Sequence, residues 1–385
     1  MSLSLRAKLA AIDKPAPKPQ AAPEKPLYIK DTVYPLHIFK HIDLATGALL
    51  SAMEGLPYPE PLDPQRVLYL DTETTGLASG AGTVAFLVGV GFLTDAGFTV
   101  RQFLMRDYSQ EGQLLKQLTA LLPGFDMLVT FNGRSFDVPL IQSRLIMNRQ
   151  SSACFDLPHL DLLHLARRTF KLRMKRCRLA DVEAEIFHEP RKDDLPGSMV
   201  PQRYFDYLKT GDFRLLEDIL SHNAQDIASL CRLLGHLSYM YAQPEQQAFS
   251  EDIFSMGLAL EKRRETERAC KCYRLASQGK LAASCQMRLG VISRRCKDYK
   301  SSLEHFKAMA KSDPTDVTPW VEMAKIYEHR LRDIDSAVNC TRRAILLLAE
   351  PRLSTNPSVQ SRQNELQYRY MRLTRKLQGK RGNAT

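Results

Sequence analysis

The sequence has no apolar run that approaches the roughly 18 residues of a membrane-spanning helix. Its first residues also lack the apolar core of a signal peptide. Residues 1–26 instead alternate alanine, proline, lysine and glutamine, a composition typical of a flexible tether. We therefore expect a cytoplasmic protein with no membrane partner.

Paired cysteines are also scarce, because the eight cysteines are scattered along the chain. Only Cys270 and Cys272 lie close together, and neither a second pair nor a histidine cluster follows at the spacing of a zinc site. We expect reduced thiols, most of them buried. Serine and cysteine side chains have no neighbouring base at a recognisable spacing, so the sequence offers no case for covalent catalysis.

Negative charge is in the minority, with 43 Asp and Glu against 54 Lys and Arg and a formal net charge of +11. This balance favours a polyanionic partner, although it is also common in proteins that never bind nucleic acid. The 385 residues are 44% hydrophobic, so the chain is long enough for two domains or for one domain with a large appendage.

Two carboxylates, Asp71 and Glu73, follow the apolar, strand-forming residues 67–70. Alternate side chains of a strand share a face, so these two point the same way. Neighbouring carboxylates repel each other unless a cation lies between them. The pair alone fits an exposed acidic turn equally well, so a metal site requires further carboxylates elsewhere.

Two such carboxylates follow in suitable places. Asp137 lies in the F-N-G-R-S-F-D-V-P-L segment, after a predicted strand and in the first turn of a predicted helix. Asp226 lies on a long amphipathic helix, and His222 is one turn earlier on the same face. Four carboxylates and one imidazole match the ligand chemistry of two divalent cations.

The hydrophobic pattern predicts a mixed α/β sheet in the first two thirds of the chain. Residues 26–64 form a lead-in segment to which no element is assigned. Two successive hairpins predict an antiparallel portion of the sheet, with strands at 67–70, 84–92, 98–105 and 127–131. Helices are expected at 110–122, 135–147, 161–171, 178–187, 202–209 and 213–241.

After about residue 250 the pattern is helical only, and it repeats. Gly257, Gly290 and Ala324 are spaced by 33 and 34 residues, each in the first helix of a predicted pair. Residues 320–327 reproduce the W-x-x-L-G-x-x-Y spacing with Met for Leu and Ala for Gly. This region resembles tetratricopeptide repeats, of which about three units are needed for a stable stack. Generic helical hairpins are the alternative.

The three acidic motifs, in this order, resemble the exonuclease motifs of the DEDD superfamily, which has the ribonuclease H-like fold. The flanking segments G-T-V-A-F-L-V-G-V-G, C-R-L-A-D-V-E, D-D-L-P-G and H-N-A-Q-D-I are similar to the YprB-like branch of bacterial predicted exonucleases, which often carry tetratricopeptide repeats. The resemblance implies an α/β ribonuclease H-like mixed-sheet domain at 27–245. An all-α tetratricopeptide-like domain at 250–350 and a basic helix and tail at 351–385 would follow.

Transferred to this sequence, the resemblance implies that Asp71 bridges two cations, that Glu73 and Asp226 complete the first, and that Asp137 helps to hold the second. Two Mg²⁺ or Mn²⁺ ions about 4 Å apart would clamp one phosphate of a single-stranded nucleic acid. His222 would accept a proton from the attacking water. The implied activity is metal-dependent 3′-to-5′ exonuclease cleavage of DNA or RNA.

The resemblance also places substrate contacts beside these ligands. Thr74 and Leu77 match positions at which relatives contact the terminal nucleotide, while Asn132 and Phe136 belong to the second acidic motif. We expect all four residues to bind substrate.

His222 departs from the family pattern. It stands four residues before Asp226, as in the tyrosine-type members, whereas histidine-type members have five. One residue turns a helix through about 100°. A packing or capping role for His222 is therefore the alternative to a catalytic base.

A dense basic run between the second and third motifs is expected to face a phosphate backbone. The competing interpretation is a solvated charged surface. The run consists of Arg167, Arg168, Lys171, Arg173, Lys175, Arg176 and Arg178.

Two further alternatives concern neighbouring residues and the whole chain. Asp161, with His159 and His164 nearby, is expected to bond backbone amides rather than a metal. The chain as a whole could be a nucleic-acid-binding scaffold whose repeats recruit a protein partner while the nuclease-like domain is weakly active or inactive.

Overall fold

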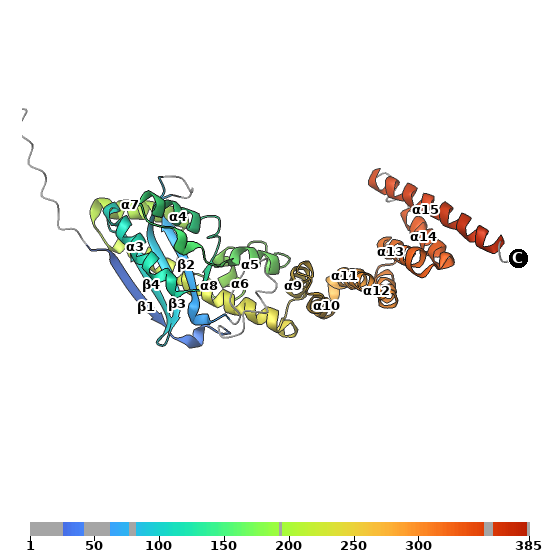
Figure 1. Ribbon diagram of the computed structural model, residues 1–385, viewed down its shortest axis with the longest axis horizontal. Coiled ribbons are helices and arrows are strands. Elements are labelled where there is room, and N and C mark those ends of the chain that lie inside the picture. Colours follow the sequence, from blue (N-terminus) through green and yellow to red (C-terminus); the bar gives the residue numbers. More distant parts are fainter. Residues whose placement is uncertain (1–25, 42–61, 77–81, 192–194, 350–356, 383–385) are drawn as a thin grey trace, which may run out of the picture.

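The computed structural model describes residues 26–41, 62–76, 82–191, 195–349 and 357–382. The predicted tether before residue 26, Leu77 and the Asp193-Asp194 pair lie outside these ranges. The sheet and its helices form one end of the molecule, and helices α9 to α15 lead away from it (Figure 1). Within the described residues, no helix is long and apolar enough to cross a membrane.

The first part of the chain forms a mixed sheet, as predicted, but it has six strands where the hydrophobic pattern predicted four. Its order is β1-β4-β3-β2-β5-β6, with antiparallel pairing from β1 to β2 and parallel pairing from β2 to β6. The strands are β1 (Tyr28–Tyr34), β2 (Val67–Thr74), β3 (Ala85–Thr94), β4 (Gly97–Leu104), β5 (Met127–Thr130) and β6 (His159–Asp161). The lead-in segment therefore contributes an edge strand, β1, which the hydrophobic pattern did not predict.

Strand β2 is central because both of its faces are buried. Val67 and Tyr69 pack into one hydrophobic cluster, while Leu68 and Leu70 pack into another on the opposite face. Each of these four residues is at most 1% exposed. The end of this strand is thus held between two cores, which gives Asp71 and Glu73 a rigid base.

Helices cover both faces of the sheet at the predicted places, with ends shifted by one or two residues. Residues of α3 (Glu111–Leu121), α4 (Asp137–Met147) and α7 (Val200–Thr210) join the cluster that contains Leu68. Residues of α5 (Leu162–Phe170), α6 (Leu179–Glu185) and most of α8 (Arg214–Ala242) join the cluster that contains Tyr69.

Helix α8 lies unusually close to strand β3. A Cβ atom on Gly89 would come within 2.2 Å of the Asn223 side chain and 2.3 Å of Ile227. Gly91 is similarly crowded by Ile227. The glycines of the G-V-G segment therefore let the helix that carries Asp226 approach the sheet.

Helices follow in packed pairs after residue 250, which confirms the predicted helical region. They are α9 (Ser250–Lys262), α10 (Thr266–Leu275), α11 (Ala282–Arg295), α12 (Tyr299–Ser312), α13 (Thr318–Ile326), α14 (Ile334–Leu348) and α15 (Pro357–Gly382). A Cβ on Gly257 would lie 2.7 Å from the Tyr273 ring, and one on Gly290 would lie 2.9 Å from Phe306. The small residues do allow close helix pairs, while tetratricopeptide identity stays a prediction.

The junction between the two parts is hydrophobic. The cluster that contains Tyr69 continues through α8 into Ile253 and Met256 of α9. Arg173 donates to Asp252, whose side chain is 3% exposed. The boundary near residue 250 stays a prediction, and one continuous hydrophobic cluster crosses it.

Candidate active site

The structure brings the predicted ligands together at the end of β2. Asn223 Nδ2 donates to Asp71 Oδ2 at 2.9 Å. The Thr72 hydroxyl donates to Asp137 at the start of α4. On α8, His222 Nε2 lies 3.5 Å from Asp226 Oδ2 and 3.9 Å from Glu73 Oε1.

The carboxylates of this cluster disturb one another's ionisation. Burial raises the pKa of Asp71 well above its usual value, and the charges of Asp226, Asp137 and Glu73 raise it further. Burial raises the pKa of Asp137 to about 6, although the Thr72 hydrogen bond opposes this shift. Burial also raises the pKa of Asp226, against the lowering effect of Arg191. The negative charge around Asp71 is thus not fully balanced by its neighbours, and a divalent cation would supply further positive charge.

Oxygen donors of this kind fit Mg²⁺ or Mn²⁺, which prefer carboxylate ligands. No three His, Cys, Asp or Glu side chains among the described residues are already arranged as a ligand set. Three of the four acids also have a polar partner: Asn223 for Asp71, Thr72 for Asp137 and Arg191 for Asp226. The chemistry of the donors fits the cations, and binding requires the carboxylates to move closer together.

Two buried amides, which the sequence patterns did not single out, support Asp71. Gln102 Nε2 on β4 donates to Asn223 Oδ1 at 2.9 Å and to the Leu220 carbonyl at 2.8 Å. Because its Oδ1 accepts from Gln102, the Asn223 amide presents its NH₂ group to Asp71. Asn223 follows His222 directly in H-N-A-Q-D-I, but nothing in the spacing indicated its partner on β4.

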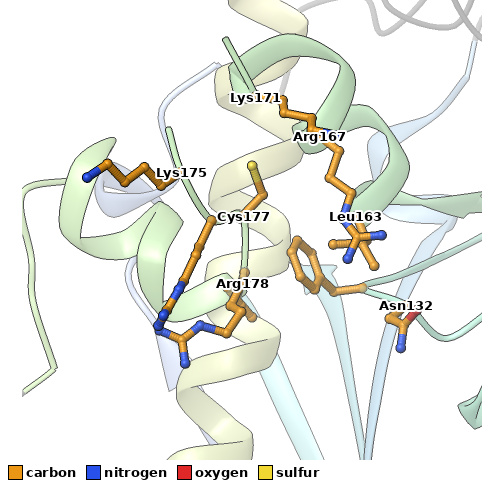
Figure 2. Close-up of a pocket in the computed structure, with 10 residues that line it drawn as sticks. Asn132, Leu163, Arg167, Lys171, Lys175, Cys177 and Arg178 are labelled. Atoms are coloured by element: carbon orange, nitrogen blue, oxygen red, sulfur yellow. The ribbon is translucent and has the colours of Figure 1, made fainter. Parts of the chain in front are cut away.

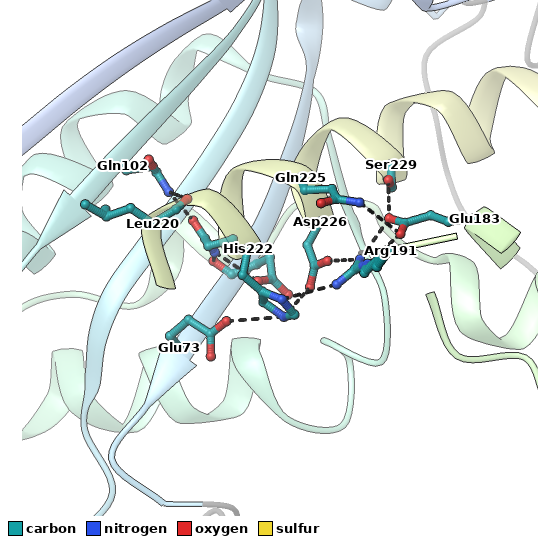
Figure 3. A network of polar contacts seen from close by, with 11 residues as sticks. Glu73, Gln102, Glu183, Arg191, Leu220, His222, Gln225, Asp226 and Ser229 are labelled. Carbon is teal, nitrogen blue, oxygen red and sulfur yellow. Dashed lines mark hydrogen bonds and ion pairs between the residues drawn. The ribbon is translucent and has the colours of Figure 1, made fainter. Parts of the chain in front are cut away.

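A buried arginine, also absent from the sequence prediction, adjoins Asp226. Arg191 donates to both carboxylate oxygens of Glu183, with Nη2 at 2.8 Å from Oε1, and its Nη2 also donates to Asp226 Oδ1. Glu183 in turn accepts from Ser229 and Gln225 of α8 (Figure 3). Glu183 lies in the C-R-L-A-D-V-E segment. Its pairing with Arg191 depends on how the chain turns after α6, which the spacing of the two residues does not predict.

Arg191 also constrains the ring of His222. Its Nη1 lies 3.3 Å from His222 Nδ1. Arginine has donors only, so Nδ1 accepts, and a neutral ring then carries its proton on Nε2. In this arrangement His222 presents a donor to the carboxylates.

The predicted substrate residues differ in how far they are exposed to solvent. Thr74 is buried, and its hydroxyl donates to the Gly76 carbonyl at 2.7 Å. Asn132 adopts a left-handed conformation with φ of 68° after β5 and is exposed, whereas Phe136 is half-buried.

Asp161 serves the backbone, as predicted. It accepts from the amide groups of Asn132 at 2.8 Å, Leu163 at 3.0 Å and Arg134 at 3.1 Å. These bonds hold the loop that leads from β5 to Asp137. His159 bonds the Thr130 hydroxyl instead of joining Asp161 as a ligand.

The basic run lines a pocket of about 700 Å³ that reaches Asn132 (Figure 2). No acidic side chain is among the described residues that line it. Two members of the run, Arg168 and Arg173, do not line the pocket, and Arg173 pairs with Asp252 instead. The cations in the pocket, called the basic pocket below, are Arg167, Lys171, Lys175, Arg176 and Arg178.

The chain is similar to known proteins in sequence and, over part of its length, in structure. The chain is 28% identical to the protein YprB of Bacillus subtilis (strain 168) over 363 residues, which are 90% of this chain and 86% of YprB. It is also similar to the structure of the family B DNA polymerase from the hyperthermophilic archaeon Pyrobaculum calidifontis. That match has a TM-score of 0.37 and 16% identity and covers 55% of this chain but only 30% of the polymerase.

The family model of the RNase H superfamily matches residues 68–238. This range begins in β2, ends in α8 and contains all five predicted catalytic residues. The chain is thus similar to the RNase H superfamily over residues 68–238.

Proposed function

We propose that this protein is a metal-dependent nuclease that shortens single-stranded nucleic acid from its 3′ end. The observation that carries the proposal is the convergence of Asp71, Glu73, Asp137 and Asp226 from one strand and two helices. Acids kept together at the cost of mutual repulsion are typical of a site that works with a cation bound.

Asp71 lies at the centre of the proposed site, since the charges of the other three acids all act on it. Together with Glu73, Asp137 and Asp226, it would hold two Mg²⁺ or Mn²⁺ ions. Bound there, the ions would supply a polarised water and stabilise charge on the leaving oxygen. The Thr72 and Asn223 hydrogen bonds hold Asp137 and Asp71 in place for this task.

His222 is the proposed acceptor of the proton from the attacking water, because it faces two of the acids. That role requires Nε2 to be free of its own proton, whereas the Arg191 contact with Nδ1 favours a proton on Nε2. The ring would therefore have to loosen its 3.3 Å contact with Arg191 as it accepts the proton.

The basic pocket suits the strand that carries the cleaved phosphate. It includes Asn132, which lies five residues before Asp137. Its cations would bind successive phosphates without regard to base sequence.

The test is digestion of 5′-labelled single-stranded DNA and RNA with Mn²⁺ or Mg²⁺, comparing the native protein with Asp71→Asn. We expect the native protein to shorten the strands stepwise when metal is present. The variant should do so at least about 100-fold more slowly, because a central carboxylate of the metal site is lost. A circular single strand serves as the control, because an exonuclease cannot cut it. The absence of metal-dependent cleavage on every substrate, or equal cleavage by the variant, would overturn the proposal.

The same assay addresses the scaffold alternative. If the repeats carry the function and the nuclease-like domain only binds nucleic acid, the native protein will bind the labelled strands without shortening them. Binding can be measured separately by fluorescence anisotropy.

A further inference from the structure

Arg191 is enclosed between two acidic residues of the RNase H superfamily domain. Its side chain is 7% exposed, that of Glu183 is 2% exposed and that of Asp226 is 16% exposed. The guanidinium forms a two-point contact with Glu183, the strongest geometry for an arginine–carboxylate pair. Arg191 therefore has a single well-defined position.

Glu183 is itself fixed to the helix that carries Asp226. Its carboxylate accepts from the Ser229 hydroxyl and, at 3.2 Å, from Gln225 Nε2. Gln225 precedes Asp226 directly, and Ser229 lies about one turn later on α8. Glu183 and Arg191 thus form a rigid unit that spans the Asp226 turn of the helix (Figure 3).

Arg191 and His222 lie beside different oxygens of Asp226. Arg191 Nη2 donates to Oδ1, whereas Oδ2 lies 3.5 Å from His222 Nε2, on the side where that ring approaches Glu73. The hydrogen bond therefore selects the rotamer in which Oδ2 is directed toward the other acids.

Two other roles for Arg191 fit the structure less well. A substrate phosphate could not reach a guanidinium that is 7% exposed and already donates to Glu183 and Asp226. A guanidinium that leaves Asp226 when a metal binds would have to part from Glu183 as well, leaving a buried charge without its partner.

We propose that Arg191 is a positioning residue that holds Asp226 with Oδ2 toward Asp71 and Glu73, so that Asp226 is ready to ligate a divalent cation. Glu183 holds Arg191 in turn. The proposal rests on the metal role proposed above for Asp226. Carboxylate ligands are commonly oriented by such outer hydrogen bonds, whose loss weakens metal binding about 10- to 100-fold.

The test measures Mn²⁺ binding to the full-length protein by isothermal titration calorimetry, without nucleic acid. We expect Arg191→Met to weaken Mn²⁺ binding about 10- to 100-fold. Arg191→Lys keeps the positive charge but cannot make the two-point contact of a guanidinium, so it should recover part of the lost Mn²⁺ affinity. The matched control is Arg144→Met, because Arg144 makes the same two-point contact with Glu111 away from the site; its affinity should equal that of the native protein.

Circular dichroism melting of each variant separates folding from ligand positioning. If Arg191→Met does not fold, the double variant Glu183→Gln with Arg191→Met removes both buried charges together and should show the same weakened binding. A folded variant that binds Mn²⁺ as tightly as the native protein, or more tightly, would overturn the proposal. Absence of saturable Mn²⁺ binding to the native protein would overturn it too. Normal Mn²⁺ binding without cleavage of nucleic acid would contradict only the proposed nuclease function.

Discussion

At the scale of single residues, Asp71 combines a rigid position with an unfavourable electrostatic environment. Residues 67–70 of its strand are buried on both faces, while Asp71 itself is partly exposed where the strand reaches the site. Burial and three neighbouring acids hold its pKa well above the usual value. Without a metal, the ionised cluster therefore destabilises the folded protein.

Replacement of Asp71 should relieve this repulsion. We expect Asp71→Asn to stabilise the metal-free protein at pH 7.5 by about 1–3 kcal/mol, a rise of a few degrees in melting temperature. Mn²⁺ should raise the melting temperature of the native protein and have a smaller effect on the variant. Asp95→Asn, in the exposed turn between β3 and β4, is the control and should change neither value. A lower melting temperature for Asp71→Asn would contradict the claim that repulsion at Asp71 destabilises the metal-free protein.

The same melting experiment has a defined pH dependence. The pKa of Asp137 is about 6 in the folded protein, above its usual value of 3.8, so the folded state keeps a proton that the unfolded chain releases. The metal-free protein should therefore lose stability as pH rises from about 4 to about 6 through this group. This loss should be smaller in Asp137→Asn, which cannot take up the proton, and melting temperatures measured between pH 4 and about 6 check it.

At the scale of elements, α8 and α9 join the sheet to the helical pairs. Close packing of α8 on Gly89 brings Asp226 to β2. Apolar residues of the same helix share a hydrophobic cluster with α9. Met256 and Leu260 of α9 are at most 1% exposed, and Asp252 fixes Arg173. The first helical pair is thus part of the structural support of the sheet.

Truncation should reveal this dependence. A chain that ends at residue 313, after α12, keeps the junction and should retain its melting temperature within a few degrees and its nuclease activity on short oligonucleotides. A chain that ends at residue 249 exposes the junction, where each lost apolar side chain is worth about 1.5–3 kcal/mol. We expect it to melt at a much lower temperature or to aggregate. Equal melting of the two chains would show that the nuclease part ends before α9.

At the scale of the whole molecule, the excess of positive charge is not spread evenly. Some cations stabilise the fold: Arg369, Arg372 and Lys376 of α15 surround Glu328, which is 1% exposed. The basic pocket differs, because Arg178 alone among its five cations forms an ion pair, with Asp181, within the described part of the chain. The pocket is therefore the surface best suited to an external polyanion.

Binding of single-stranded nucleic acid should depend on salt through this pocket. In the Asp71→Asn background, Lys171, Lys175 and Arg176 are replaced together by serine. The plot of log K against log salt should become less steep by about 2, because each lost phosphate contact on a single strand contributes about 0.7 to the slope. The charge-matched control replaces Lys300, Lys307 and Lys311 of α12 by serine. If the control lowers the slope as much as the pocket variant does, the pocket is not the preferred surface for the strand.

Much of the fold followed from local patterns. The apolar runs before Asp71 and before Asp137 predicted β2 and β5, and helical periodicity placed Asp226 on α8. Strand β1 escaped prediction because its faces are largely exposed and its partner β4 lies about 70 residues away, so little in its own residues marked it. Within the basic run, Arg173 faces α9 instead of the pocket, a direction that charge density alone does not reveal.

The sequence by itself determined the four acids, their settings on strand and helix, and the small residues of the helical pairs, because these depend on neighbours within one or two turns. Only the tertiary structure decided which groups hold the acids in place. Gln102 reaches Asn223 and Arg191 reaches Asp226 across separate elements. Such contacts depend on the distance and angle between packed elements, which no spacing along the chain encodes.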